Sequence, residues 1–259
     1  MIDVFGLHTA QLETFFLIWV RVSTMLLIMP VFGTAQIPTP VRVALGLIVS
    51  FVIYPTVPAI APLNDLDSLA VALTTQVIIG ILFGFVTQLV FMGVQFAGEI
   101  IDIQIGFAVA NVINPATQSQ VTIVGEFQLA IATIIFLITN SHLLFFQGMG
   151  GSFHMLPLPW ATITVATQHG LITFFTQALL IVFSIAAPAA ITLFLVNIAL
   201  AFLARVAPQM NIFVIGFPMQ ITIGLLMLIL TLPLLGYALP NLFGQVPREL
   251  DSLMRSMSS

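Results

Sequence analysis

Residues 69–97 read LAVALTTQVIIGILFGFVTQLVFMGVQFA, and no charged side chain interrupts them. An α-helix of this length is ~43 Å long at ~1.5 Å per residue, whereas the hydrocarbon core of a bilayer is ~30 Å thick. The stretch therefore predicts a membrane-type helix that is longer than one crossing needs. Within it, GILFG at residues 80–84 places two glycines at the GxxxG spacing, which permits close approach of another helix.

The rest of the chain has the same apolar character. Hydrophobic residues make up 60% of the 259 residues and charged residues only 5%, whereas soluble domains carry about 25% charged residues. This composition predicts an integral membrane protein. We expect an all-α fold, because a helix satisfies its backbone hydrogen bonds within one segment.

We expect about six apolar runs that form broken helices and helical hairpins in a single domain, residues 1–259. Pro188 predicts that the fifth run is two half-helices, and Pro218 and Pro233 predict interruptions of the sixth. The glycines of QGMGGS, residues 147–152, predict a loop, and residues 245–259 predict a separate amphipathic tail. The runs cover residues 12–32, 41–54, 69–97, 121–146, 171–206 and 212–239.

Several kinds of chemistry are excluded by missing residues. The chain has no lysine and no cysteine, which excludes a Schiff base, a disulfide and thiol redox chemistry. Its four histidines do not form HExxH, and GxSxG does not occur. A net charge of -4 offers no basic surface for nucleic acid. We expect no cofactor, no metal, no enzymatic activity and no nucleic-acid partner.

The few basic residues do not predict an orientation in the membrane, because Arg42 and Arg205 would lie on one side and Arg248 and Arg255 on the other. Arg21 lies inside the first apolar run. An arginine that faces lipid there costs ~2.5 to 3.5 kcal/mol on insertion scales. We therefore expect Arg21 to face protein or water, and expect partner subunits to cover these poorly matched spans.

A polar segment, GEIIDIQIGFAVANVINPATQSQ, occupies residues 98–120 between two apolar runs. Glu99 and Asp102 would share one helix face, or they are two solvated acids in a loop. Asn114 and Pro115 suit the N-cap and first turn of the next helix. Residues 105–113, IGFAVANVI, are too apolar for a free loop and too few to span the membrane. We expect a re-entrant plug loop, at about residues 105–120, that lines a wet lumen.

A second polar segment, ARVAPQMNIFVIGFP, occupies residues 204–218. Its local features predict a connection between two helices. Arg205 would interact favourably with the C-terminal end of the first helix, Pro208 would stop that helix, and Asn211 would cap the next. Gly216 and Pro218 further along fit close packing against another backbone.

Together, the two polar segments resemble the FliR family, the R subunit of the flagellar type III export gate, which has T-subunit counterparts in injectisomes. The resemblance covers essentially the whole chain, and ARVAPQMNIFVIGFP is its most specific part. It implies a structural and gating subunit that assembles with FliP-type and FliQ-type subunits and with the B-type export switch subunit. The implied gate lies in the bacterial inner membrane at the flagellar basal body, in contact with lipid and raised toward the periplasm. Unfolded flagellar proteins would pass through it.

The resemblance also implies roles for individual residues. The plug candidates are Ile105, Gly106, Phe107, Val109, Val112 and Ile113, with Gly106 supplying conformational freedom. The candidates for the lumen or a polar network are Glu99, Asp102 and Gln104. The candidates for subunit contacts are Arg205, Gln209, Asn211, Gly216 and Pro218.

Two other functions fit the same composition less well. An ion-coupled secondary transporter would use Glu99, Asp102 and Glu126 as coupling carboxylates near the membrane centre. An intramembrane hydrolase would need a nucleophile or metal constellation that the sequence does not show.

Overall fold

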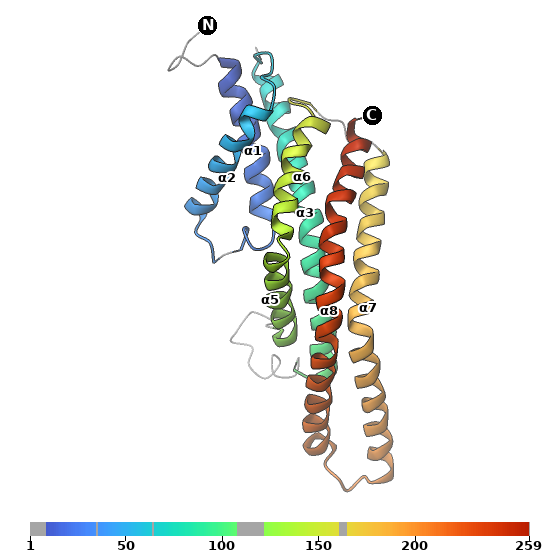
Figure 1. Cartoon of the computed structure of the whole chain (residues 1–259). Coiled ribbons are helices and arrows are strands. Elements are labelled where there is room, and N and C mark those ends of the chain that lie inside the picture. Colours follow the sequence, from blue (N-terminus) through green and yellow to red (C-terminus); the bar gives the residue numbers. More distant parts are fainter. Residues whose placement is uncertain (1–8, 35, 64, 108–121, 161–164, 259) are drawn as a thin grey trace. The chain divides into compact units, whose positions relative to one another are not determined.

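The structure, a computed structural model, describes residues 9–34, 36–63, 65–107, 122–160 and 165–258. Every element in these residues is a helix, which confirms the all-α class. Five described helices are long and apolar enough to cross a membrane, or six if the broken pair α5 and α6 is one span. In chain order (Figure 1) the elements are α1 (Thr9–Ile28), α2 (Thr39–Ile53), the 3₁₀ helix η1 (Tyr54–Thr56), α3 (Leu66–Ile105), α5 (Ile123–Ile138), α6 (Ser141–Met155), α7 (Val165–Val206) and α8 (Ile212–Ser258).

The predicted breaks at prolines are wrong. α7 continues through Pro188, and α8 continues through Pro218 and Pro233 into the tail, which is not a separate segment. Helices in membranes tolerate proline where nearby hydroxyls and neighbouring helices supply hydrogen bonds. Here Thr192 donates its hydroxyl to the Pro188 carbonyl at 2.7 Å, and Thr222 does the same to Pro218, which adds a hydrogen bond one turn after each proline. The carbonyls that lose their N–H donor are those four residues earlier, at Ser184 and Val214.

The predicted loop at residues 147–152 is also wrong, because α6 runs through these glycines. Glycine costs only about 1 kcal/mol in a helix interior, and α6 offsets that cost by burying Phe145, Met149 and Phe153. The chain breaks earlier instead, at Asn140. Its backbone has φ 54°, a left-handed conformation that asparagine adopts more readily than most residues.

The chain divides into two compact units. Unit 1 comprises Met1–Leu89, Asn140–Phe175 and Gly244–Ser259. Unit 2 comprises Val90–Thr139 and Thr176–Phe243. Three helices, α3, α7 and α8, therefore contribute residues to both units.

Unit 1 is built around Arg21, which is 2% exposed. Its Nε donates to the Gln76 side chain at 2.7 Å, and its Nη atoms donate to the carbonyl oxygens of Ser152 at 3.2 Å and Leu156 at 3.1 Å. The Phe153 ring lies 4.2 Å from the guanidinium carbon. Arg21 thus binds the C-terminal end of α6, where helix carbonyls favour a cation. The expectation that this arginine faces protein is confirmed.

The glycines of GILFG bring α3 against α1 within unit 1. A Cβ atom on Gly80 would lie 2.7 Å from the carbonyl oxygen of Arg21, and one on Gly84 would lie 2.7 Å from the Cβ of Ile28. Real Cβ atoms do not approach other atoms so closely, so these positions need glycine. The predicted close approach is confirmed, and its partner is a helix of the same chain.

Candidate functional site

The predicted polar network residues lie on the last turns of α3. This helix ends at Ile105, eight residues beyond the predicted end, so Glu99, Asp102 and Gln104 are helical. The alternative that the two acids lie in a loop is wrong. All the contacts of this site belong to unit 2, where α3, α5, α7 and α8 meet.

Asp102 caps a neighbouring helix. Its carboxylate is 3% exposed and accepts hydrogen bonds from the backbone N–H groups of Val124, at 3.1 and 3.0 Å, and Gly125, at 3.4 Å. These groups belong to the first turn of α5, whose own N-cap residue, Thr122, makes no side-chain capping bond. The first N–H groups of a helix lack partners within the helix and carry a partial positive charge. A buried carboxylate from α3 therefore satisfies them.

Glycines allow α3 and α5 to touch beside this cap. A Cβ atom on Gly98 would lie 2.5 Å from the Cα of Gly125, and one on Gly125 would lie 3.1 Å from the carbonyl oxygen of Gln95. On the same side, the Gln95 side chain donates to the Glu126 carboxylate at 3.3 Å. The start of α5 is therefore held against α3 by backbone contact and by the Asp102 cap.

Gly106 ends α3. It has φ 94°, in the left-handed region that glycine adopts freely. Its N–H donates to the carbonyls of Asp102, at 3.1 Å, and Ile103, at 3.2 Å, and the next N–H, of Phe107, also donates to the Asp102 carbonyl, at 3.1 Å. This pattern is the glycine C-cap that closes many helices. The predicted conformational role of Gly106 agrees with this geometry.

Ile105 and Phe107, two of the plug candidates, pack into the core of unit 2. Ile105 is fully buried, and Phe107 packs against the same cluster. Gly224 of α8 faces Ile105 so closely that any side chain at position 224 would overlap it. The cluster consists of Ile101, Ile105, Val124, Ala189, Leu193 and Leu228. The other plug candidates, Val109, Val112 and Ile113, lie outside the described residues, as does Asn114; α5 begins at Ile123.

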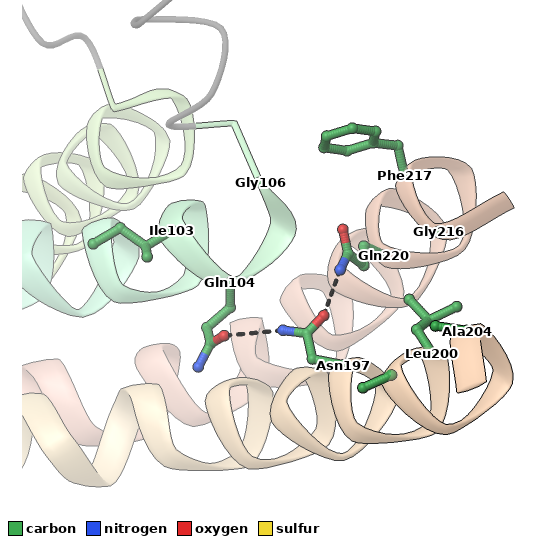
Figure 2. Close-up of a pocket in the computed structure, with 10 residues that line it drawn as sticks. Ile103, Gln104, Gly106, Asn197, Leu200, Ala204, Gly216, Phe217 and Gln220 are labelled. Atoms are coloured by element: carbon green, nitrogen blue, oxygen red, sulfur yellow. Dashed lines mark hydrogen bonds between the residues drawn. The ribbon is translucent and has the colours of Figure 1, made fainter. Parts of the chain in front are cut away.

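Three side-chain amides, those of Gln104 on α3, Asn197 on α7 and Gln220 on α8, are hydrogen-bonded in series, and we call them the amide ladder (Figure 2). Asn197 donates from Nδ2 to Gln104 Oε1 at 3.3 Å, and its Oδ1 accepts a hydrogen bond from Gln220 Nε2. Gln104 was predicted to join a polar network, whereas Asn197 and Gln220 were not identified from the sequence. Their signal is a single amide within each apolar run, LFLVNIALAF and GFPMQITIGL.

The amide ladder borders a pocket of about 370 Å³. None of the described residues that line it is charged, and several of them are small. Gln104, Gly106 and Gly216, which were predicted for three different roles, all line it (Figure 2). The lining residues are Ile103, Gln104, Gly106, Asn197, Leu200, Ala201, Ala204, Gly216, Phe217 and Gln220. An uncharged, partly polar surface of this kind can contact polypeptide without holding any one charge strongly.

The remaining interface candidates lie near the connection between α7 and α8. Arg205 is in the last turn of α7, and Asn211 directly precedes α8, where its carbonyl accepts the Val214 N–H at 3.1 Å. The predicted helix connection is thus confirmed. Arg205, Gln209, Asn211 and Pro218 are all exposed in this chain, and their role in subunit contacts stays a prediction.

Known bacterial export proteins are similar to this chain along nearly its whole length. Residues 12–246 match the family described as bacterial export proteins, family 1. The flagellar biosynthetic protein FliR of Pectobacterium carotovorum is 32% identical over 255 residues, covering 95% of this chain and 94% of that protein. FliR of Bacillus subtilis is 28% identical over 243 residues, covering 93% and 94%. The Yop proteins translocation protein T of Yersinia pestis is 31% identical over 228 residues, covering 85% of each chain.

Replacing the Asp102 cap tests its contribution to stability. Asp102→Ala leaves buried N–H groups of α5 without their acceptor, so we expect a loss of about 1 to 2 kcal/mol. Asp102→Asn keeps one acceptor oxygen, and we expect a smaller loss. Thermal unfolding in mild detergent measures both, with Asp251→Ala at an exposed position of α8 as the control. Wild-type stability for Asp102→Ala would contradict the capping role.

Two glycines of α8 provide a matched test of the contact with Ile105. Gly224→Val places methyl groups where the buried Ile105 side chain lies, so we expect destabilisation by about 1 to 3 kcal/mol. Gly236→Val is the control, because a Cβ atom there meets nothing within 4 Å. The measurement is again thermal unfolding in mild detergent. Equal unfolding temperatures for the two variants would show that Gly224 is not needed to accommodate Ile105.

Proposed function

The chain belongs to family 1 of the bacterial export proteins, the family of the flagellar biosynthetic protein FliR, and from this premise we propose that it is a structural and gating subunit of the flagellar type III export channel. The match over residues 12–246 is the observation that carries the proposal. The proposed role is non-enzymatic: the chain forms part of a closed conduit for unfolded flagellar proteins.

Partner subunits are part of the proposal, and helix lengths support it. At ~1.5 Å per residue, the 40, 42 and 47 residues of α3, α7 and α8 correspond to ~60, ~63 and ~70 Å, about twice the thickness of a bilayer core. Large apolar side chains are exposed along these helices, such as Phe183, Phe202 and Ile229. Apolar surface beyond the lipid requires protein cover. In the proposal, FliP-type, FliQ-type and B-type subunits supply this cover. The assembly lies in the inner membrane at the basal body, and the whole chain acts as one subunit of it.

The proposed plug starts where α3 ends. The Gly106 turn leads the chain from α3 into residues 108–121, and the uncharged pocket with its amide ladder lies at this turn. Neutral amides and small residues suit a lumen through which unfolded chains of varied charge must pass. This placement supports Gly106 and Phe107 as the start of the plug.

An ion-coupled transporter is the second candidate, and the carboxylate contacts speak against it. Such a transporter needs acidic groups free to bind and release an ion. Asp102 instead accepts backbone hydrogen bonds from α5, and Glu126 accepts one from Gln95. A carboxylate that is required to cap a buried helix end is poorly suited to exchange ions in each transport cycle.

Co-purification tests the proposed assembly. When the chain is extracted from its native membrane in mild detergent, we expect it to elute with the FliP-type and FliQ-type subunits as one stable complex, because its long apolar helices need protein partners. Size-exclusion chromatography followed by mass spectrometry of the peak identifies the components. A monodisperse monomer that catalyses substrate-coupled flux after reconstitution would favour the transporter instead.

Deletion of residues 106–113 tests the plug. We expect assembled gates that lack these residues to leak ions and small molecules, because the deletion opens the conduit. Leakage is measured as conductance of reconstituted gates, and co-purification of the partners confirms that the deleted chain still assembles. Assembled gates as tight as the wild type would contradict a plug in this segment.

A further inference from the structure

We infer that Asn197 is the positioning residue for the end of α3, and so sets the point from which the proposed plug leaves the helix. For its effect on gating the inference rests on the proposed function. The positioning itself follows from contacts within unit 2. None of the roles given above to the plug, network and interface candidates includes this residue.

Asn197 lies at the centre of the amide ladder and uses both halves of its side chain. It donates to Gln104 of α3 and accepts from Gln220 of α8, while its own backbone belongs to α7. A primary amide is both a donor and an acceptor. An apolar side chain of similar size, such as leucine, can make neither bond. Asn197 therefore links three helices through one side chain.

The bond to Gln104 acts close to the turn. Gln104 is two residues before Gly106, and both line the same pocket. The turn at Gly106 is itself fixed by the hydrogen bonds that Gly106 and Phe107 donate back to the last turn of α3, so the place from which the chain leaves Gly106 follows the position of that last turn. Gln104 belongs to that turn, and its neighbour Ile105 fits against Gly224. The end of α3 is thus held by an apolar contact at Ile105 and by hydrogen bonds at Gln104.

The pocket makes the polar contact important. Its volume of about 370 Å³ beside Gln104 and Gly106 means that the residues the structure describes do not pack closely next to the turn. Close packing resists displacement in most protein interiors, and here that resistance is reduced. Hydrogen bonds are directional, so the ladder can hold α3 in register with α7 and α8 where packing is incomplete. Because the ladder is uncharged, salt does not screen it as it screens an exposed ion pair.

Distances between spin labels test the positioning directly. The chain has no cysteine, so a pair of introduced cysteines can be labelled without other changes. The reporting pair is Ile103→Cys on α3 and Leu195→Cys on α7, where the native side chains are 66% and 59% exposed. A second pair, Leu195→Cys and Leu226→Cys, spans α7 and α8 only and reports whether that hairpin stays folded. Both pairs are measured in the full-length chain within its detergent-extracted complex.

The variants are Asn197→Leu, Gln104→Leu and their combination, with Asn241→Leu as a matched control. Asn241 is exposed on α8, and within the described residues its side chain donates to its own helix, at the Tyr237 carbonyl. We expect Asn197→Leu to broaden or shift the distribution of distances between labels at positions 103 and 195. The distribution between labels at positions 195 and 226 should stay unchanged. Gln104→Leu should produce the same change at α3, and the double variant no more than either alone, because each variant removes the same hydrogen bond between Asn197 and Gln104.

Three outcomes would overturn the inference. The first is an unchanged 103 to 195 distribution in Asn197→Leu. The second is a change of equal size in Asn241→Leu. The third is full additivity of the two ladder variants. If Asn197→Leu also alters the 195 to 226 distribution, the hairpin has been disturbed, and Gln104→Leu, which leaves α7 and α8 intact, decides the matter.

Conductance of the assembled gate tests the consequence for gating. We expect Asn197→Leu gates to leak more than wild type and less than gates without residues 106–113, with Asn241→Leu gates tight. Tight Asn197→Leu gates beside leaky deleted gates would overturn the link to gating and leave the proposed plug standing. If the deleted gates are also tight, the proposed plug fails, and the label distances alone decide whether Asn197 positions α3.

Discussion

The requirement that every buried helix end find hydrogen-bonding partners governs the arrangement of unit 2. α5 starts inside the protein, and its first N–H groups need an acceptor that its own N-cap residue does not provide. Asp102 supplies that acceptor from α3. The same turn of α3 also supplies the carbonyl that accepts the N–H groups after the helix end, at Gly106 and Phe107. One residue therefore connects the end of α3 to the start of α5, the two helices that flank the proposed plug.

Unit 1 satisfies the same requirement at the opposite kind of helix end. There the groups without a donor in their own helix are carbonyls at the end of α6, and their partner is the guanidinium of Arg21. An acid at a helix start and a base at a helix end both complement the helix dipole. In a chain with so few charged residues, two of them are buried for this purpose. Charge here is used to join helices within the chain as well as to interact with water or partners.

The sequence predicted the features that depend on composition or on neighbouring residues. The membrane class, the burial of Arg21, the close approach at GILFG and the helix connection before Asn211 were all predictable in this way. The errors came from treating proline and glycine as strong breaks. The buried aromatic side chains of α6 offset the cost of its glycines, and α7 continues through Pro188 although that proline removes one backbone hydrogen bond. The end of α3 could not be predicted, because the partner of Asp102 lies 22 residues further along the chain. Asn197 and Gln220 were missed because a single amide in an apolar run does not indicate its partner.

The unbroken course of α7 and α8 through their prolines has a consequence for the outer surface of these helices. Proline has no N–H, so the carbonyl four residues earlier loses its usual donor. For Pro188 and Pro218 these carbonyls belong to Ser184 and Val214, and all four residues are exposed in this chain. Each of these two carbonyls therefore lacks the N–H donor that a residue other than proline would supply. A donor from an adjoining helix, or a water molecule at the rim of the bilayer, would find a directional attachment point there, beside exposed apolar side chains such as Phe183.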